Sequence, residues 1–257
     1  MFERIVIGVE GSPESLVAVR QGARLLRPDG SLVLAAVAEV ALAVHAGWAA
    51  TPVLDEIVSE AQGGLASASA EAPGAETLLL EGSPGPGLLE AARARRADLL
   101  SVGTHGGSRA AGILLGSVAT LVLHEAPCSV LIARPSTEDD AAFPRSICVG
   151  VDGSPSSARA AEVARRLAQD FDAPLAVIAA CGEVKIDLDE LRSVEPAATL
   201  DHRPPVEALV ERAAEGDADL LVVGSRGMHG MAALGSVSER VAHRAGCSVL
   251  VVRDEDP

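Results

Sequence analysis

Aromatic residues are nearly missing from this chain: they make up 2% of its 257 residues, and tyrosine is absent. The core must therefore be aliphatic, and the chain lacks the aromatic platforms on which single-stranded nucleic acids stack their bases. Basic residues are also few, with a formal net charge of −15 and one lysine, Lys185. Because nucleic acids are bound mainly through Lys and Arg contacts to phosphate, this composition argues against them as partners.

Long apolar runs are missing as well. None approaches the roughly 20 residues that a helix needs to cross a bilayer, so we expect no membrane partner. The N-terminus, Met1–Ile7, has no basic stretch followed by a long apolar one, which predicts no signal peptide. We therefore expect a cytoplasmic protein.

Metal-binding spacings are missing too. No cysteines form a CxxC motif, and the histidines make no i,i+4 pair and have no cysteine at zinc spacing. We therefore predict no metal site made from protein side chains. We expect the four cysteines, Cys128, Cys148, Cys181 and Cys247, to be buried, reduced thiols.

One glycine pattern occurs twice. Gly103-Thr104-His105-Gly106 is followed after nine residues by Gly116-Ser117, and Gly224-Ser225-Arg226-Gly227 is followed after seven by Gly235-Ser236. Each pattern lies between an apolar run typical of a strand and a helical pattern. Glycine-rich turns between a strand and a helix bring backbone N–H groups up to a phosphate. The sequence therefore predicts two copies of one fold, each with a candidate nucleotide cradle.

The two copies also begin alike. Glu10-Gly11-Ser12-Pro13 and Asp152-Gly153-Ser154-Pro155 each follow an apolar strand. Both serines can cap a helix whose first residue is the proline, and the first of these helices is expected to reach Leu26. Further strands are predicted at 32–37, 76–80, 97–102, 129–133, 175–180, 197–201, 218–223 and 248–252, and helices from Thr51, at 88–96, from Ser117, at 206–214 and from Ser236. Ser236-Val237-Ser238-Glu239 reads as a capping box.

A polar, acidic segment with prolines at Pro135 and Pro144 is the natural linker. We therefore expect a first domain at 1–135, a linker at 136–144 and a second domain at 145–257. The second domain is trimmed, because Gly182–Glu195 is too short for a helix equal to the one that begins at Thr51.

Strands that alternate with helices predict an α/β fold, with two open, five-stranded parallel sheets covered by helices on both faces. In a 3-2-1-4-5 strand order, ligands bind at the switch point between strands one and four. Glu10 and Asp152 follow strand one, and Gly103 and Gly224 follow strand four. This pairing suits a nucleotide, with the carboxylate at the ribose and backbone amides at the phosphates.

In these motifs the chain resembles the universal stress protein family in its tandem form. ATP-binding members of that family carry G-x-x-G, nine residues, and then G-S or G-T, with an Asp after the first strand. The first copy matches the glycine pattern without a gap, and the second has the aspartate, Asp152. The likeness covers nearly the whole chain outside the linker.

The resemblance implies a cytoplasmic stress-response protein that binds ATP and has its two copies paired about a pseudo-twofold axis. Because the acidic chain should repel a free nucleotide, we expect Mg²⁺ to accompany the ATP. A homodimer of the whole chain stays open. In the first copy the resemblance places Glu10 and Gly103 at the ribose, Val37 at the adenine, and Gly106, Gly116, Ser117 and Val118 around the phosphates. In the second copy the matching candidates are Asp152, Gly224, Gly227, Gly235 and Ser236.

Each copy departs from the family pattern in one place. Glu10 stands where the family has Asp, and the loop Met228–Leu234 is two residues short. We favour the first copy as the nucleotide site, because one extra methylene is easier to accommodate than a shortened loop. The alternative is a family member that has lost nucleotide binding and acts through protein–protein contacts.

Catalytic machinery is not evident. The chain has neither a phosphate loop that ends in Gly-Lys-Ser/Thr nor a Ser-Gly-Gly pyrophosphate loop after its first strand. No nucleophile, base and orienting group assemble from its motifs, so we assign no catalytic residue and expect no enzyme. Slow hydrolysis of bound ATP stays open.

Overall fold

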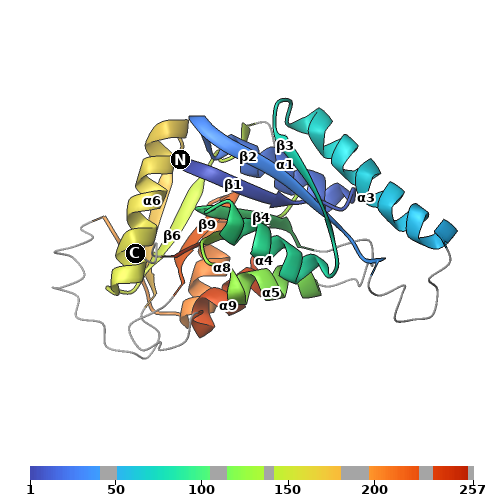
Figure 1. Cartoon of the computed structure of the whole chain (residues 1–257). Coiled ribbons are helices and arrows are strands. Elements are labelled where there is room, and N and C mark those ends of the chain that lie inside the picture. The colour runs from blue at the N-terminus through green and yellow to red at the C-terminus, as the bar shows by residue number, and fades with distance from the viewer. Residues whose placement is uncertain (41–50, 105–114, 136–141, 181–196, 226–233, 254–257) are drawn as a thin grey trace. The chain divides into compact units, whose positions relative to one another are not determined.

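A computed structural model describes residues 1–40, 51–104, 115–135, 142–180, 197–225 and 234–253 (Figure 1). The described chain forms two compact units, one from Phe2 to Arg134 and one from Pro135 onward. None of its described helices is both long and apolar enough to cross a membrane.

The first unit is a parallel sheet in the order β3-β2-β1-β4-β5. Helices α1 and α3 pack on each other; α1 also packs on β1, β4 and β5, and α3 on β2 and β3. Helix α4 packs against α5 and on β1 and β2. Its elements are β1 (Phe2–Gly8), α1 (Pro13–Arg24), β2 (Leu26–Ala38), α3 (Thr51–Glu71), β3 (Glu76–Glu81), α4 (Pro84–Ala94), β4 (Leu99–Gly103), α5 (Ser117–Glu125) and β5 (Ser129–Ala133).

The second unit repeats this strand order, as β8-β7-β6-β9-β10, and its strands are again parallel. Helix α6 packs on β6 and β9, and α8 packs against α9. Its elements are β6 (Ile147–Val151), α6 (Pro155–Phe171), β7 (Leu175–Ala180), β8 (Thr199–Asp201), α8 (Pro205–Glu215), β9 (Leu220–Gly224), α9 (Ser236–Arg244) and β10 (Ser248–Val252). The predicted α/β class and the 3-2-1-4-5 order are confirmed in each unit.

The first helix of each repeat begins as predicted. Ser12 and Ser154 are N-cap residues, and their hydroxyl oxygens accept hydrogen bonds from the N–H groups three residues later, at 3.1 and 3.2 Å. The glycine before each serine has a positive φ, +87° at Gly11 and +84° at Gly153, which L side chains rarely adopt. The strand-to-helix turn is thus the same in both repeats.

Some expected boundaries are wrong. Helix α1 ends at Arg24, and Leu26 instead opens β2, with a shift in register before Ser31. Helix α4 begins at Pro84, four residues before the predicted start.

The predicted capping box is also wrong. Gly235, and not Ser236, is the N-cap of α9, and it makes no side-chain cap. The Gly235 N–H donates to the Ser225 carbonyl at 2.6 Å, a contact across the loop that the local pattern could not reveal.

The amino ends of both sheets are held by equivalent aspartates. Asp98, before β4, accepts hydrogen bonds from the backbone N–H groups of Glu3 at 2.7 Å and Arg4 at 2.9 Å. Asp219, before β9, accepts hydrogen bonds from the backbone N–H groups of Arg145 at 3.0 Å and Ser146 at 3.2 Å. Each aspartate therefore ties the start of its central strand to the strand beside it.

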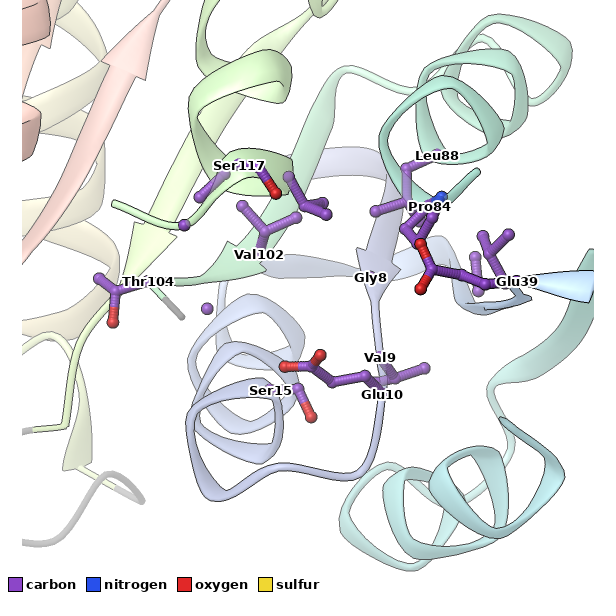
Figure 2. Close-up of a pocket in the computed structure, with 16 residues that line it drawn as sticks. Gly8, Val9, Glu10, Ser15, Glu39, Pro84, Leu88, Val102, Thr104 and Ser117 are labelled. Atoms are coloured by element: carbon purple, nitrogen blue, oxygen red, sulfur yellow. The ribbon is translucent and has the colours of Figure 1, made fainter. Parts of the chain in front are cut away.

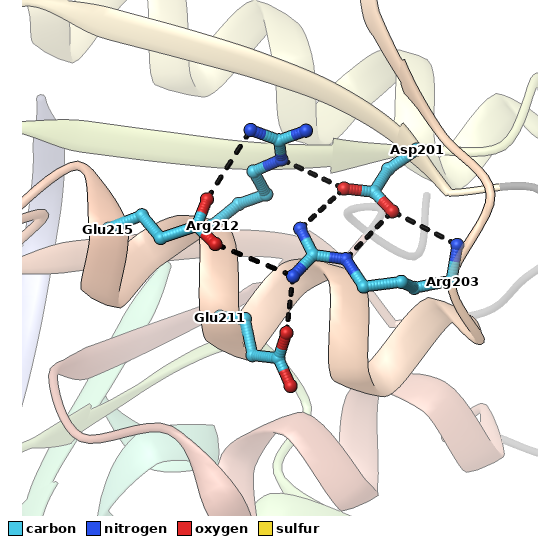
Figure 3. Close-up of polar contacts among 5 residues, drawn as sticks. All are labelled: Asp201, Arg203, Glu211, Arg212 and Glu215. Carbon is cyan, nitrogen blue, oxygen red and sulfur yellow. Dashed lines mark hydrogen bonds and ion pairs between the residues drawn. The ribbon is translucent and has the colours of Figure 1, made fainter.

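An ion-pair network secures the short edge strand β8 (Figure 3). The Asp201 carboxylate, 4% exposed, accepts hydrogen bonds from Arg203 at 2.6 and 2.9 Å and from Arg212 Nε at 2.8 Å. Glu211 and Glu215 on α8 contact the outer nitrogens of the two guanidinium groups. The hydrogen bonds from Arg203 lower the pKa of Asp201 well below its usual range. The network fastens the end of β8 to α8.

The expected burial of the thiols is seen for two of the four cysteines, and the linker bounds stay a prediction. Cys128 and Cys148 are buried, Cys247 is half-buried, and Cys181 lies outside the described residues. Burial raises the pKa of the Cys148 thiol to about 12. Residues 136–141 of the predicted linker also lie outside the described part, but Phe143 is 1% exposed, so the linker's end packs into the protein.

Candidate functional site

A cavity of about 330 Å³ lies at the carboxyl ends of β1, β2 and β4, where the strand order reverses (Figure 2). The first turns of α1, α4 and α5 complete its walls. It is lined by Gly8, Val9, Glu10, Ser15, Ala35, Val37, Glu39, Pro84, Leu88, Val102, Gly103, Thr104, Gly116, Ser117, Val118 and Ala119. Its two ends differ in chemistry.

One end is the N-terminus of α5. Gly116 is the N-cap, with φ −64° and ψ 163°, and it has no side chain with which to cap the helix. Its own N–H donates to the Thr104 carbonyl at 2.7 Å. The next three N–H groups, of Ser117, Val118 and Ala119, have no partner within the helix because they belong to its first turn. They carry the positive end of the helix dipole and line the cavity.

The other end has an apolar wall, made by Val37 at the end of β2 and by Pro84 and Leu88 on α4, and the exposed Glu39 side chain lies beside it. The β1–β2 ladder stops at Ala35, whose carbonyl accepts from the Val9 N–H at 2.9 Å. Alternate residues of a strand direct their backbone groups to the same side, so the N–H and C=O of Val37 face the space beyond β1. This end of the cavity therefore combines an apolar wall with one backbone donor and one backbone acceptor.

Glu10 lies between the two ends, just after β1, and its side chain is exposed at the cavity. Its Oε1 accepts a hydrogen bond from the Ser12 hydroxyl at 2.8 Å. Desolvation by the surrounding protein raises the pKa of Glu10, and the nearby carboxylates of Glu14, Glu39 and Glu60 raise it further, while the Ser12 bond lowers it. Negative charge is therefore concentrated on this wall.

Two close backbone approaches shape the site. A Cβ on Gly103 would lie 2.8 Å from the carbonyl oxygen of Glu14, and a Cβ on Gly64 of α3 would lie 2.9 Å from the carbonyl carbon of Glu10. Such distances are too short for any side chain. Gly103 thus has a packing reason to be glycine, independent of any ligand.

The structure brings the predicted residues of the first repeat together. Gly106 lies outside the described residues. The other six line the cavity: Glu10, Val37, Gly103, Gly116, Ser117 and Val118. The motifs missed the lining residues Glu39, Thr104, Pro84 and Leu88. Pro84 and Leu88 lie on one face of α4 at i,i+4 spacing, but the predicted helix begins only at Leu88 and so does not include Pro84.

In the second repeat, Asp152, Gly224, Gly235 and Ser236 occupy the corresponding ends of β6, β9 and α9, and Gly227 lies outside the described residues. Asp152 Oδ1 accepts from the Ser154 N–H at 3.0 Å, so the carboxylate turns back on its own loop.

The two repeats also differ inside the turn after the fourth strand. Ser238 Oγ donates to the Gly224 carbonyl at 2.5 Å, whereas the first repeat has the methyl group of Ala119 at this position. The Gly224 carbonyl of the second repeat is therefore bonded to a side chain of α9, a bond that Ala119 cannot make in the first repeat.

Comparison with known proteins agrees with this architecture. The sequence matches the Universal stress protein family over residues 1–134 and 180–253. A universal stress protein of Mycobacterium tuberculosis H37Rv is 30% identical over 301 residues, with 97% of this chain and 96% of that protein covered. One from Mycolicibacterium smegmatis is 30% identical over 291 residues with the same coverage.

Among solved structures, a universal stress protein from Archaeoglobus fulgidus shares the fold with a TM-score of 0.78 at 22% identity. The match covers 98% of this chain and 97% of that one. The residues that match the family include both glycine patterns, at 103–117 and 224–236. The chain belongs to the universal stress protein family.

Proposed function

We propose that this stress-response protein binds an adenine nucleotide in the cavity of its first repeat and signals through the occupancy of that site. The observation that carries the proposal is the uncapped N-terminus of α5, whose first-turn amides line the cavity opposite an apolar wall. A helix N-terminus of this kind binds phosphate groups without a basic side chain. The volume, about 330 Å³, falls within the range of small-molecule sites.

The cavity has a place for each part of the ligand. Phosphates belong at Ser117 and Val118, and the base belongs against Leu88 and Val37. The Val37 C=O and N–H match the 6-amino group and N1 of adenine, which are a donor and an acceptor. The second carboxylate oxygen of Glu10, on the wall between the two ends, is suited to accept from the ribose hydroxyls.

Charge favours a metal-bound nucleotide. The described residues that line the cavity include no lysine or arginine, and Glu10 and Glu39 are both among them. A bare triphosphate would be repelled by these carboxylates, whereas Mg²⁺ neutralises phosphate charge and accepts oxygen ligands. The residues present therefore fit Mg-ATP better than free ATP.

A matched pair of variants tests the proposal by isothermal titration calorimetry with Mg-ATP. Gly116→Glu places a carboxylate before the α5 amides and should abolish binding, because the backbone there, at φ −64°, accepts any residue and the fold should persist. Gly235→Glu makes the same change in the second repeat and should leave binding in the first repeat intact. Circular dichroism checks the fold of both.

Two results would contradict the proposal. Unchanged affinity in Gly116→Glu would remove the first repeat as the site. No heat from the unmodified protein with millimolar adenine nucleotides would favour the alternative, in which the protein acts through protein–protein contacts.

A further inference from the structure

Glu39 carries a charged side chain at the end of the cavity where we place the adenine base. It follows directly on β2, two residues beyond Val37, so the two side chains extend to the same side of the strand. That side faces α4, since a Cβ on Gly87 would lie 3.1 Å from Val37 Cγ2. Figure 2 shows the Glu39 carboxylate turned into the pocket beside Pro84.

A carboxylate is an acceptor without a donor. Placed beside an apolar wall, it is satisfied by a base edge that presents N–H groups and is repelled by one that presents a carbonyl oxygen. The 6-amino group of adenine has two N–H donors, and the Val37 carbonyl can accept one of them. The second is then available to Glu39.

We propose that Glu39 makes the site selective for 6-aminopurines over 6-oxopurines. The inference rests on the proposed function of the cavity. With a 6-oxopurine, an oxygen would face both the Val37 carbonyl and the Glu39 carboxylate, and the protonated N1 would face the Val37 N–H. Glu39 is exposed, so discrimination comes from the hydrogen bond that adenine gains and from the oxygen–oxygen repulsion that a 6-oxopurine meets.

Calorimetry with Mg-ATP and Mg-ITP, which differ at position 6 of the purine and in the N1 proton, tests the inference on the full chain. The unmodified protein should prefer Mg-ATP. Glu39→Gln should reduce the ATP-to-ITP affinity ratio about tenfold, because the Gln amide can also donate to a purine oxygen. Glu39→Ala should reduce the ratio as well, by removing the repulsion.

Glu60→Gln is the control for charge alone. Glu60 is also close enough to raise the pKa of Glu10, but it lies on α3 and does not line the cavity. Its loss should change both affinities by the same factor and leave the ratio unaltered.

An ATP-to-ITP ratio within twofold of the unmodified value in Glu39→Gln and Glu39→Ala would overturn the inference while leaving nucleotide binding in place. Equal affinity of the unmodified protein for the two nucleotides would overturn it too. Failure of the unmodified protein to bind either nucleotide would instead overturn the proposed function, and the selectivity with it.

Discussion

The end of β4 lies directly against the first turn of α1: a methyl group on Gly103 would come within 2.8 Å of the Glu14 carbonyl oxygen. The second repeat has the same relationship, since a methyl group on Gly224 would lie 2.7 Å from the carbonyl oxygen of Ser156. The first glycine of each motif therefore fixes how closely a strand end and a helix start approach, and this distance sets the floor of the cavity in the first repeat.

Gly103→Ala should therefore lower the free energy of unfolding by about 1–3 kcal/mol, the usual cost of adding a methyl group to a packed region. Urea denaturation followed by circular dichroism measures the change. Gly246→Ala is the control, because a Cβ at Gly246 meets nothing within 4 Å. Equal stability of the two variants would show that the Gly103 backbone has room to move.

Two adjacent glycines in α3 offer a sharper comparison. Gly63→Ala adds a methyl group in open space and should stabilise the protein by up to about 1 kcal/mol, through helix propensity alone. Gly64→Ala would press on the backbone of Glu10 and Gly11, so it should destabilise the protein and weaken Mg-ATP binding. Chemical denaturation and calorimetry on both variants check this, and a stabilising Gly64→Ala would contradict the packing of α3 on the β1–α1 loop.

Stability should depend on pH through Glu10. Its pKa is raised in the folded protein from an ordinary value of 4.5, so the folded state binds its proton more tightly than the unfolded state. The carboxylate therefore costs stability above the folded pKa and costs nothing below about pH 4.5. Glu10→Gln keeps an acceptor for Ser12 and should give a small rise in the urea midpoint at pH 7 that disappears near pH 4. A rise that persists in acid would contradict this assignment.

Asp201→Asn should destabilise the second repeat by about 1–3 kcal/mol, because it removes charged hydrogen bonds at a buried position. The pKa of Asp201 is lowered by folding, so the carboxylate stabilises above its unfolded value of about 3.8 and the variant's deficit should shrink in stronger acid.

Glu162→Gln, which breaks exposed pairs with Arg159 and Arg166, is the control for Asp201→Asn and should change stability by less than about 1 kcal/mol. Thermal unfolding at several pH values compares the two. If Asp201→Asn lowered stability as little as Glu162→Gln does, Asp201 would be dispensable for holding β8.

Local signals were enough to predict most of the architecture. The Ser-Pro pairs after the first strands gave both helix starts, and the apolar runs at Ser129–Ala133, Leu175–Ala180 and Ser248–Val252 are strands with those bounds. Glu10 and Gly103 could be placed at one cavity because parallel strands end at a common edge.

What could not be predicted depends on contacts between distant residues. Ser236 looks like an N-cap, but the bond from the Gly235 N–H to Ser225 sets the helix start. Glu39 carries no motif, and its place in the cavity follows from where the β1–β2 ladder stops. The Asp201 network joins a strand to a helix through side chains whose spacing is not periodic.

The aspartates before the fourth strands, Asp98 and Asp219, hold equivalent backbone contacts at the edge of each sheet that lies away from the glycine turns. At the opposite edge the side chains of the two halves differ: Glu10 aligns with Asp152, and Ala119 aligns with Ser238. The bonds that anchor the amino ends of these strands thus do not depend on which side chains stand at the carboxyl ends. Side chains at the carboxyl ends can therefore change in one repeat while the backbone contacts that anchor its strands stay in place.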